Sequence, residues 1–121
     1  MDPMDMEYFR DLLHRTRAEV ESTLEPIHAR LRDGGRDSGA EVAVAVHHPA
    51  DAAADSEMRE LDVTSAAMFE ERLRMVEDAL RRIDDGTYGT CIACGRPIIA
   101  ERLELVPETP YCVEDAAKAN G

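Results

Sequence analysis

Large aromatic side chains are scarce in this sequence, which has no tryptophan, three tyrosines and two phenylalanines among 121 residues. Much of the 44% apolar content comes instead from 17 alanines. Because large apolar side chains supply most of the area buried in a thick globular core, such a core is not expected. The composition favours helices that meet along narrow apolar seams.

Basic residues are also few, with 14 Lys and Arg against 26 Asp and Glu and a net charge of −12. This balance disfavours direct binding to DNA or to an anionic membrane surface. No apolar run approaches the roughly 18 residues that a membrane span needs. The first ten residues, MDPMDMEYFR, are too acidic and polar for a secretory signal. We therefore expect a cytoplasmic protein with no direct contact to DNA or membranes.

Residues 6–32 are predicted to form a helix because apolar or small residues recur there at steps of three and four. The stripe has the width of a seam between two helices rather than of a globular core face. Gly34 and Gly35 predict its end. The stripe consists of Phe9, Leu13, Thr16, Val20, Leu24, Ile27 and Leu31.

A second helix is predicted over residues 56–85, with Asp55 or Ser56 as its N-cap and Gly86 after its end. Two helices with apolar seams favour an antiparallel coiled-coil hairpin within one chain, over residues 1–86, and hence a monomer. The alternative is a dimer that forms through the same two stripes. The second seam consists of Phe69, Leu73, Val76, Leu80 and Ile83.

The connection between the helices, about residues 34–55, is expected to be an acidic tip loop. Eight acidic residues and two arginines lie between Asp33 and Asp62. The acids can be solvated turn residues that favour the N-terminus of the second helix. Alternatively, the tip can deliver carboxylates to a cationic or metal-containing pocket of a partner.

Three cysteines, an odd number, argue against a simple disulfide framework and suggest metal ligands or redox thiols. Cys91-x-x-Cys94-Gly95 is typical of a zinc knuckle, in which the glycine permits a left-handed turn. Cys112 follows after 17 residues, and Asp115 stands where a second C-x-x-C would have its last cysteine. A carboxylate can ligate zinc, so the spacing predicts one zinc ion bound by Cys91, Cys94 and Cys112, with Asp115 or water as the fourth ligand.

Two alternatives to zinc stay open for this finger. It can be held without metal by a small apolar core, or its thiols can act as redox sensors. The apolar residues available for the metal-free core are Ile98, Ile99, Leu103, Leu105 and Val106.

The stretch DGTYGTCIACGRPIIAERLELVPETPYC, residues 85–112, resembles the finger of the DksA/TraR family. Members of that family are bacterial factors that bind RNA polymerase, core or holoenzyme, and do not bind DNA directly. The resemblance implies a mainly α fold. It also implies a long coiled-coil hairpin, a C4-type zinc finger with a treble-clef-like form over residues 87–121, and a short terminal helix.

In that family the coiled-coil tip enters the secondary channel of the polymerase and carries the motif Asp-x-x-Asp-x-Ala. Counting back from Cys91 without gaps places the motif on residues 48–53, so the resemblance implies that His48, Asp51 and Ala53, with Asp55 nearby, contact the polymerase. His48 replaces the first acid. The resemblance to the family further implies regulation of transcription initiation in the stringent response, with guanosine tetraphosphate as a partner. However, Met75 stands where the family has an alarmone-contacting basic residue.

Three other functions are alternatives to a transcription regulator. A transcript-cleavage factor of the Gre type would have a larger β-rich domain after its hairpin, whereas only about 35 residues follow here. A thiol-based stress sensor would oxidise Cys91, Cys94 and Cys112. An enzyme is disfavoured because the sequence has no nucleophile–base pattern and no glycine-rich phosphate loop.

Overall fold

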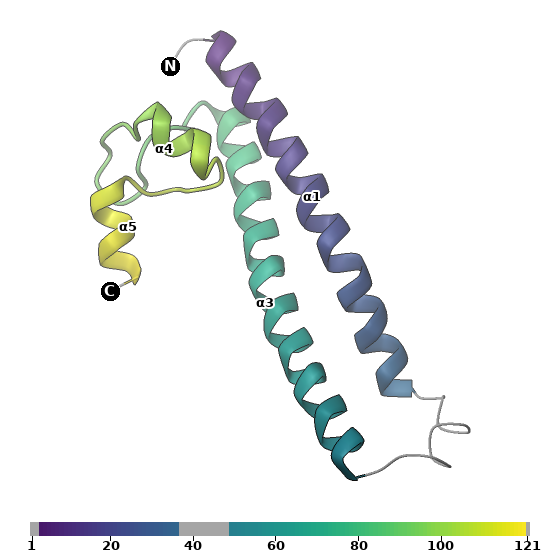
Figure 1. Cartoon of the computed structure of the whole chain (residues 1–121). Coiled ribbons are helices and arrows are strands. Elements are labelled where there is room, and N and C mark those ends of the chain that lie inside the picture. Colours follow the sequence, from purple (N-terminus) through teal and green to yellow (C-terminus); the bar gives the residue numbers. More distant parts are fainter. Residues whose placement is uncertain (1–2, 37–48, 121) are drawn as a thin grey trace. The chain divides into compact units, whose positions relative to one another are not determined.

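The computed structural model describes residues 3–36 and 49–120, which form four helices (Figure 1). They are α1 (Pro3–Arg36), α3 (Pro49–Asp85), α4 (Ala100–Leu105) and α5 (Val113–Asn120). Within these residues there is no β-strand, only one isolated antiparallel bridge between Thr90 and Pro97. The predicted mainly α fold, with two long helices and a small C-terminal module, is confirmed. None of the helices described is long and apolar enough to cross a membrane.

The second long helix starts earlier than predicted. α3 begins at Pro49, so the proposed N-cap at Asp55 or Ser56 is wrong. Proline suits the first position of a helix because the backbone N–H that it lacks would have no partner there. The alanine-rich residues 50–54 then favour helix, and acids near an N-terminus interact well with the helix dipole. α1 ends at Arg36, one residue beyond the two glycines that predicted its end.

Contacts group the chain into two units. The first comprises Met1–Glu19 and Arg72–Gly121, and the second comprises Val20–Glu71. Each unit contains one part of α1 and one part of α3.

In the first unit, the beginning of α1, the end of α3 and the finger share one apolar core. The rings of Phe9 and Tyr88, from α1 and the finger, have centroids 5.8 Å apart. Ion pairs flank this core on the helices, with Arg10 Nη2 3.2 Å from Asp84 Oδ1 and Arg17 Nη2 3.4 Å from Glu77 Oε2. The finger is therefore built onto the helix pair. The buried core residues are Phe9, Leu13, Val76, Ala79, Ile83, Tyr88, Cys91, Ile98 and Leu103.

In the second unit, α1 and α3 are joined by an apolar seam and by polar pairs across it. Val20, Leu24 and Ile27 of α1 and Ala66 of α3 are buried. Arg30 donates two hydrogen bonds to Asp62, at 3.0 and 2.9 Å, and His28 Nε2 lies 2.7 Å from Glu70 Oε2. The two long helices thus pack against each other within one chain, as predicted.

The two predicted seams differ in how well they match the structure. Six of the seven α1 positions are buried, and only Leu31 is half-buried. In α3 only Val76 and Ile83 of the five are buried, whereas Phe69, Leu73 and Leu80 are half-buried. Ala66 and Ala79, which the prediction left out, are buried instead. An alanine lets two helices approach closely, so larger neighbours lie at the sides of the seam.

Candidate metal centre

The first two cysteines lie on a tight turn that follows α3. The turn is closed by a hydrogen bond from Gly95 N to Cys91 O at 2.9 Å, and Cys91 N donates to Arg96 O at the same distance. Gly95 has φ +77°, a conformation that residues with a side chain rarely adopt. The predicted left-handed turn at this glycine is therefore confirmed.

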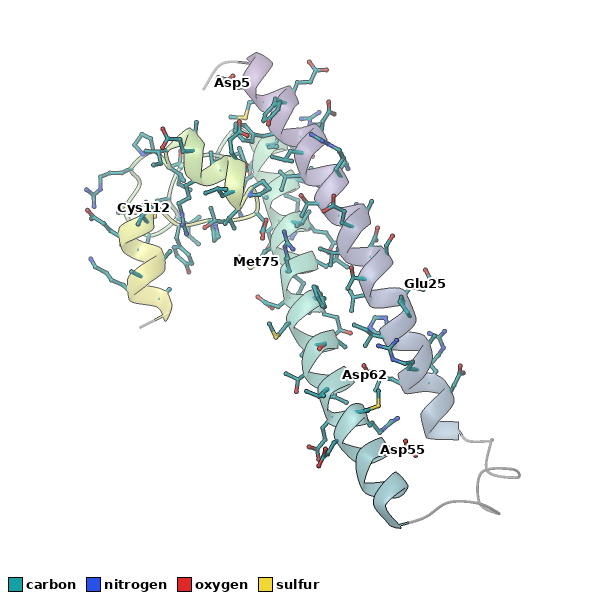
Figure 2. The ribbon with its side chains drawn as sticks, in the orientation of Figure 1. Asp5, Glu25, Asp55, Asp62, Met75 and Cys112 are labelled. Carbon is teal, nitrogen blue, oxygen red and sulfur yellow. The ribbon has the colours of Figure 1, made fainter. Side chains whose placement is uncertain are left out.

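The second pair of predicted ligands lies at the start of α5. Cys112 directly precedes this helix, and Asp115 lies in its first turn. Figure 2 labels Cys112 at this junction. Residues three apart at a helix start lie on the same side, which turns both side chains toward one point. A backbone hydrogen bond from Ile92 N to Pro110 O, 2.9 Å, ties this segment to the knuckle.

The four predicted ligands come together. One ligand atom from each of Cys91, Cys94, Cys112 and Asp115 lies within 4.8 Å of the others. Asp115 Oδ2 accepts hydrogen bonds from the thiols of Cys91, at 3.0 Å, and Cys112, at 3.3 Å. The sulfurs of Cys94 and Cys112 are 3.8 Å apart, and all three cysteines are free of disulfides.

The surroundings of the cluster shift the pKa values of three of its four ligands, in different directions. Burial and the hydrogen bond to Asp115 act to raise the pKa of Cys91, but hydrogen bonds from the backbone at Cys112, Cys94 and Ala93 outweigh them and lower that pKa. The thiols of Cys91, Cys94 and Cys112 lower the pKa of Asp115 to about 2 by donating to its carboxylate. A backbone hydrogen bond at Asp115 acts to lower the pKa of Cys112, but burial and hydrogen bonds with the side chains of Asp115, Cys94 and Cys91 outweigh it and raise that pKa. Two of the three shifts therefore favour the charged forms that zinc binds.

The cluster also has the dimensions that zinc requires. Two thiolates bound tetrahedrally at about 2.3 Å lie about 3.8 Å apart, which is the separation of Cys94 and Cys112. A thiolate and a carboxylate oxygen around zinc would lie slightly farther apart than the S–H···O contacts seen here. Small side-chain movements would therefore let three sulfurs and Oδ2 of Asp115 surround one ion.

The apolar core of the finger is smaller than its sequence suggested. Ile98 and Leu103 are buried, and Val106 is half-buried. Ile99 is 58% exposed and Leu105 is 82% exposed, so neither contributes to a core that could hold the finger without metal. The short helix α4 has only one buried position, Leu103.

A polar link between the finger and α3 was not predicted from the sequence. Glu108 is 5% exposed, and its Oε2 accepts a hydrogen bond from Arg72 Nε at 3.1 Å. Thr109, also buried, lies beside Arg102, which donates to Thr109 Oγ1 and to Tyr111 O. No sequence signal marks Glu108, because its burial depends on an arginine 36 residues away.

The predicted polymerase-contacting residues are only partly described by the structure. His48 lies outside the described residues. Asp51 and Ala53 belong to the start of α3 rather than to a loop, and their side chains lie outside the description. Asp55 is exposed on the same helix (Figure 2).

Known proteins resemble this chain both in the finger and in the whole fold. The family model described as the prokaryotic dksA/traR C4-type zinc finger matches residues 86–119. A solved structure of transcription factor DksA2 from Pseudomonas aeruginosa superposes with a TM-score of 0.78 and 31% sequence identity. The superposition covers 98% of this chain and 85% of that one. This chain belongs to the DksA/TraR family.

Two curated relatives extend the comparison. YteA of Bacillus subtilis, itself uncharacterized, is 33% identical over 114 residues, which are 87% of this chain but 48% of that protein. The chain thus matches about half the length of that relative. The RNA polymerase-binding transcription factor DksA of Escherichia coli is 23% identical over 114 residues, covering 94% of this chain and 70% of that protein.

Membership in the DksA/TraR family bears on the metal. The family model is that of a C4-type zinc finger, and this chain has three cysteines and Asp115 clustered where such a finger has four ligands. The family and the geometry together support zinc as the cofactor. When bound, zinc would supply structural cross-links between the knuckle and α5.

Proposed function

We propose that this chain is a transcription regulator that binds bacterial RNA polymerase through the secondary channel and modulates initiation without binding DNA directly. The observation that carries the proposal is the match to DksA2 over 98% of the chain. The Escherichia coli relative is named as an RNA polymerase-binding factor. Both relatives are named as transcription factors rather than enzymes, and we propose no catalysed reaction for this chain.

The charges near the start of α3 support this proposal. Asp55, Glu57 and Glu60 are all exposed within six residues of that helix. The arginine among them, Arg59, donates to the backbone carbonyl of Leu31 at 3.3 Å. An exposed acidic helix is attracted to a cationic channel and repelled by nucleic acid.

Asp51 is the residue that we propose to act on the polymerase, with His48, Ala53 and Asp55 as further contacts. Because α3 begins at Pro49, Asp51 belongs to a helix. Positions 51 and 55 are four residues apart and therefore share one side of it. A carboxylate fixed on a helix approaches its target with less loss of conformational freedom than one in a loop.

The finger has an architectural role in this proposal. In it, residues 1–86 are the hairpin that reaches into the channel, and residues 87–121 are the finger. Guanosine tetraphosphate is not part of the proposal, because Met75 is apolar and Arg72 is engaged by Glu108. We propose that a monomer is sufficient.

The proposal is tested by binding measurements on the purified chain. It should bind purified bacterial RNA polymerase in sedimentation or size-exclusion experiments and should not shift duplex DNA at physiological salt. Bound chain should also exclude a known secondary-channel ligand from the polymerase. DNA binding without any association with polymerase would contradict the proposal.

A further inference from the structure

The carboxylate of Asp115 divides its two oxygens between the thiols and a cation. Oδ2 accepts hydrogen bonds from Cys91 and Cys112, whereas Oδ1 lies 4.0 Å from Nζ of Lys118. The Asp115 side chain is 12% exposed and that of Lys118 is 78% exposed. One oxygen thus faces the ligand cluster, and the other faces a solvated ammonium group.

The helix α5 brings Asp115 and Lys118 together. Asp115 and Lys118 are three residues apart on α5, a spacing that places side chains next to each other on a helix surface. Lys118 is also the only lysine of the sequence. Its ammonium is a compact point charge on a flexible stem, which allows it to stay near Oδ1 of Asp115.

The negative charge of the metal-bound site would be stabilised by a nearby cation. Three thiolates and one carboxylate around a divalent ion sum to a net charge of about −2. Arg96 follows Cys94 by two residues, and its Nη2 pairs with Glu114 at 3.2 Å rather than with Asp115. Lys118 is therefore the cation that pairs with Asp115.

We propose that Lys118 is a positioning residue for the metal centre. By pairing with Oδ1 of Asp115, it would leave Oδ2 alone as the fourth ligand when an ion is bound, and the second carboxylate oxygen would not coordinate. Groups that orient a ligating carboxylate from outside the first ring of ligands typically contribute 10- to 100-fold to metal affinity. The proposal concerns this chain alone and does not depend on RNA polymerase.

The first test compares zinc affinities in competition with a chelator of known affinity. Lys118→Gln should weaken zinc binding by about 10- to 100-fold. Arg81→Gln is the matched control, because Arg81 forms the same kind of pair, three residues apart, with Asp78 on α3, and neither residue is a predicted ligand. This control removes the same charge and should change affinity less than about threefold. Lys118→Arg, which keeps the charge, should recover most of the wild-type affinity.

The second test uses Co²⁺ as a spectroscopic probe of the same site. Tetrahedral Co²⁺ absorbs visible light more strongly than five-coordinate Co²⁺, and thiolate charge-transfer bands report the number of bound sulfurs. Lys118→Gln should weaken the visible bands and leave the charge-transfer bands unchanged. If Lys118→Gln matches Arg81→Gln in both zinc affinity and spectrum, the proposal is wrong. Loss of the charge-transfer bands as well would also contradict it, because the sulfurs themselves would then have left the ion.

Discussion

Nε of Arg72 lies 3.1 Å from Oε2 of Glu108, and this pair fastens the finger to α3. The Glu108 side chain is 6% exposed and that of Arg72 is 43% exposed. The other carboxylate oxygen, Oε1, is buried and has no hydrogen-bond partner among the residues that the structure describes. The buried carboxylate therefore depends on a single arginine.

Replacing Arg72 should destabilise the protein more than the loss of an ordinary surface ion pair. Arg72→Met leaves the buried Glu108 carboxylate without its partner, which should lower the free energy of unfolding by about 1–3 kcal/mol. Arg81→Met, which breaks a pair that is largely exposed, should cost less than about 0.5 kcal/mol. Urea unfolding of both variants measures the difference. Equal losses would show that the Glu108 carboxylate has access to other partners.

Leu13 should be among the most sensitive apolar positions. Its side chain is fully buried in the core that α1, α3 and the finger share. Leu13→Ala should lower the free energy of unfolding by about 2–5 kcal/mol, because it removes apolar burial and leaves a cavity. Leu61→Ala is the control, since Leu61 is 66% exposed, and should change stability by less than about 0.5 kcal/mol. Thermal or denaturant unfolding in saturating zinc measures both losses. Equal losses in the two variants would contradict the assignment of Leu13 to the shared core.

Tyr88 should make the protein sensitive to alkaline pH. Burial raises the pKa of this phenol well above its ordinary value of 10.0, and its hydroxyl donates to Pro107 O at 2.8 Å. Because the folded state holds the proton more tightly, the contribution of Tyr88 to stability is complete below pH 10 and is lost as the pH rises above it.

Tyr88→Phe tests this pH dependence. At pH 8 the variant should be less stable by about 0.5–1.5 kcal/mol, because Pro107 O loses its donor. Above pH 10 the wild type should lose this advantage by up to about 1.4 kcal/mol per pH unit. Denaturant unfolding at several pH values gives the comparison. Parallel loss of stability in both proteins would assign the alkaline sensitivity to other groups.

The identity of the fourth ligand should set the strength of zinc binding. Asp115→Cys completes a four-thiolate set and should raise zinc affinity by about tenfold or more, which is roughly 1.4 kcal/mol. Asp115→Asn has nearly the same shape but no charge and should lower the affinity. Chelator competition measures both, and removal of zinc from the wild type should lower its melting temperature. A melting temperature that chelation leaves unchanged would favour a finger held without metal.

The sequence predicted best those features that repeat locally. The α1 seam from Phe9 to Ile27 follows steps of three and four, and all six of its positions are buried. The C-x-x-C-G knuckle likewise encodes its own turn through Gly95. Ala66 and Ala79 are buried but were not predicted as part of the α3 seam. A small side chain adds little to a hydrophobic pattern, even where it lets two helices touch.

Features that depend on distant partners could not be predicted. The burial of Glu108 is set by Arg72, and the role of Lys118 follows from where Asp115 points. The start of α3 was missed for a different reason. Asp55 and Ser56 offered a good N-cap, but the proline at residue 49 and the alanines after it start the helix one and a half to two turns earlier.

The central claim, that an acid at the start of α3 acts within the polymerase, is tested most directly by the lifetime of promoter complexes. Asp51→Asn removes one charge with little change in shape, and Asp11→Asn does the same at an exposed site on α1. Both variants should bind RNA polymerase nearly as well as the wild type. We predict that Asp51→Asn loses most of the effect on promoter-complex lifetime while Asp11→Asn keeps it. An Asp51→Asn protein that alters the lifetime as the wild type does would contradict the account.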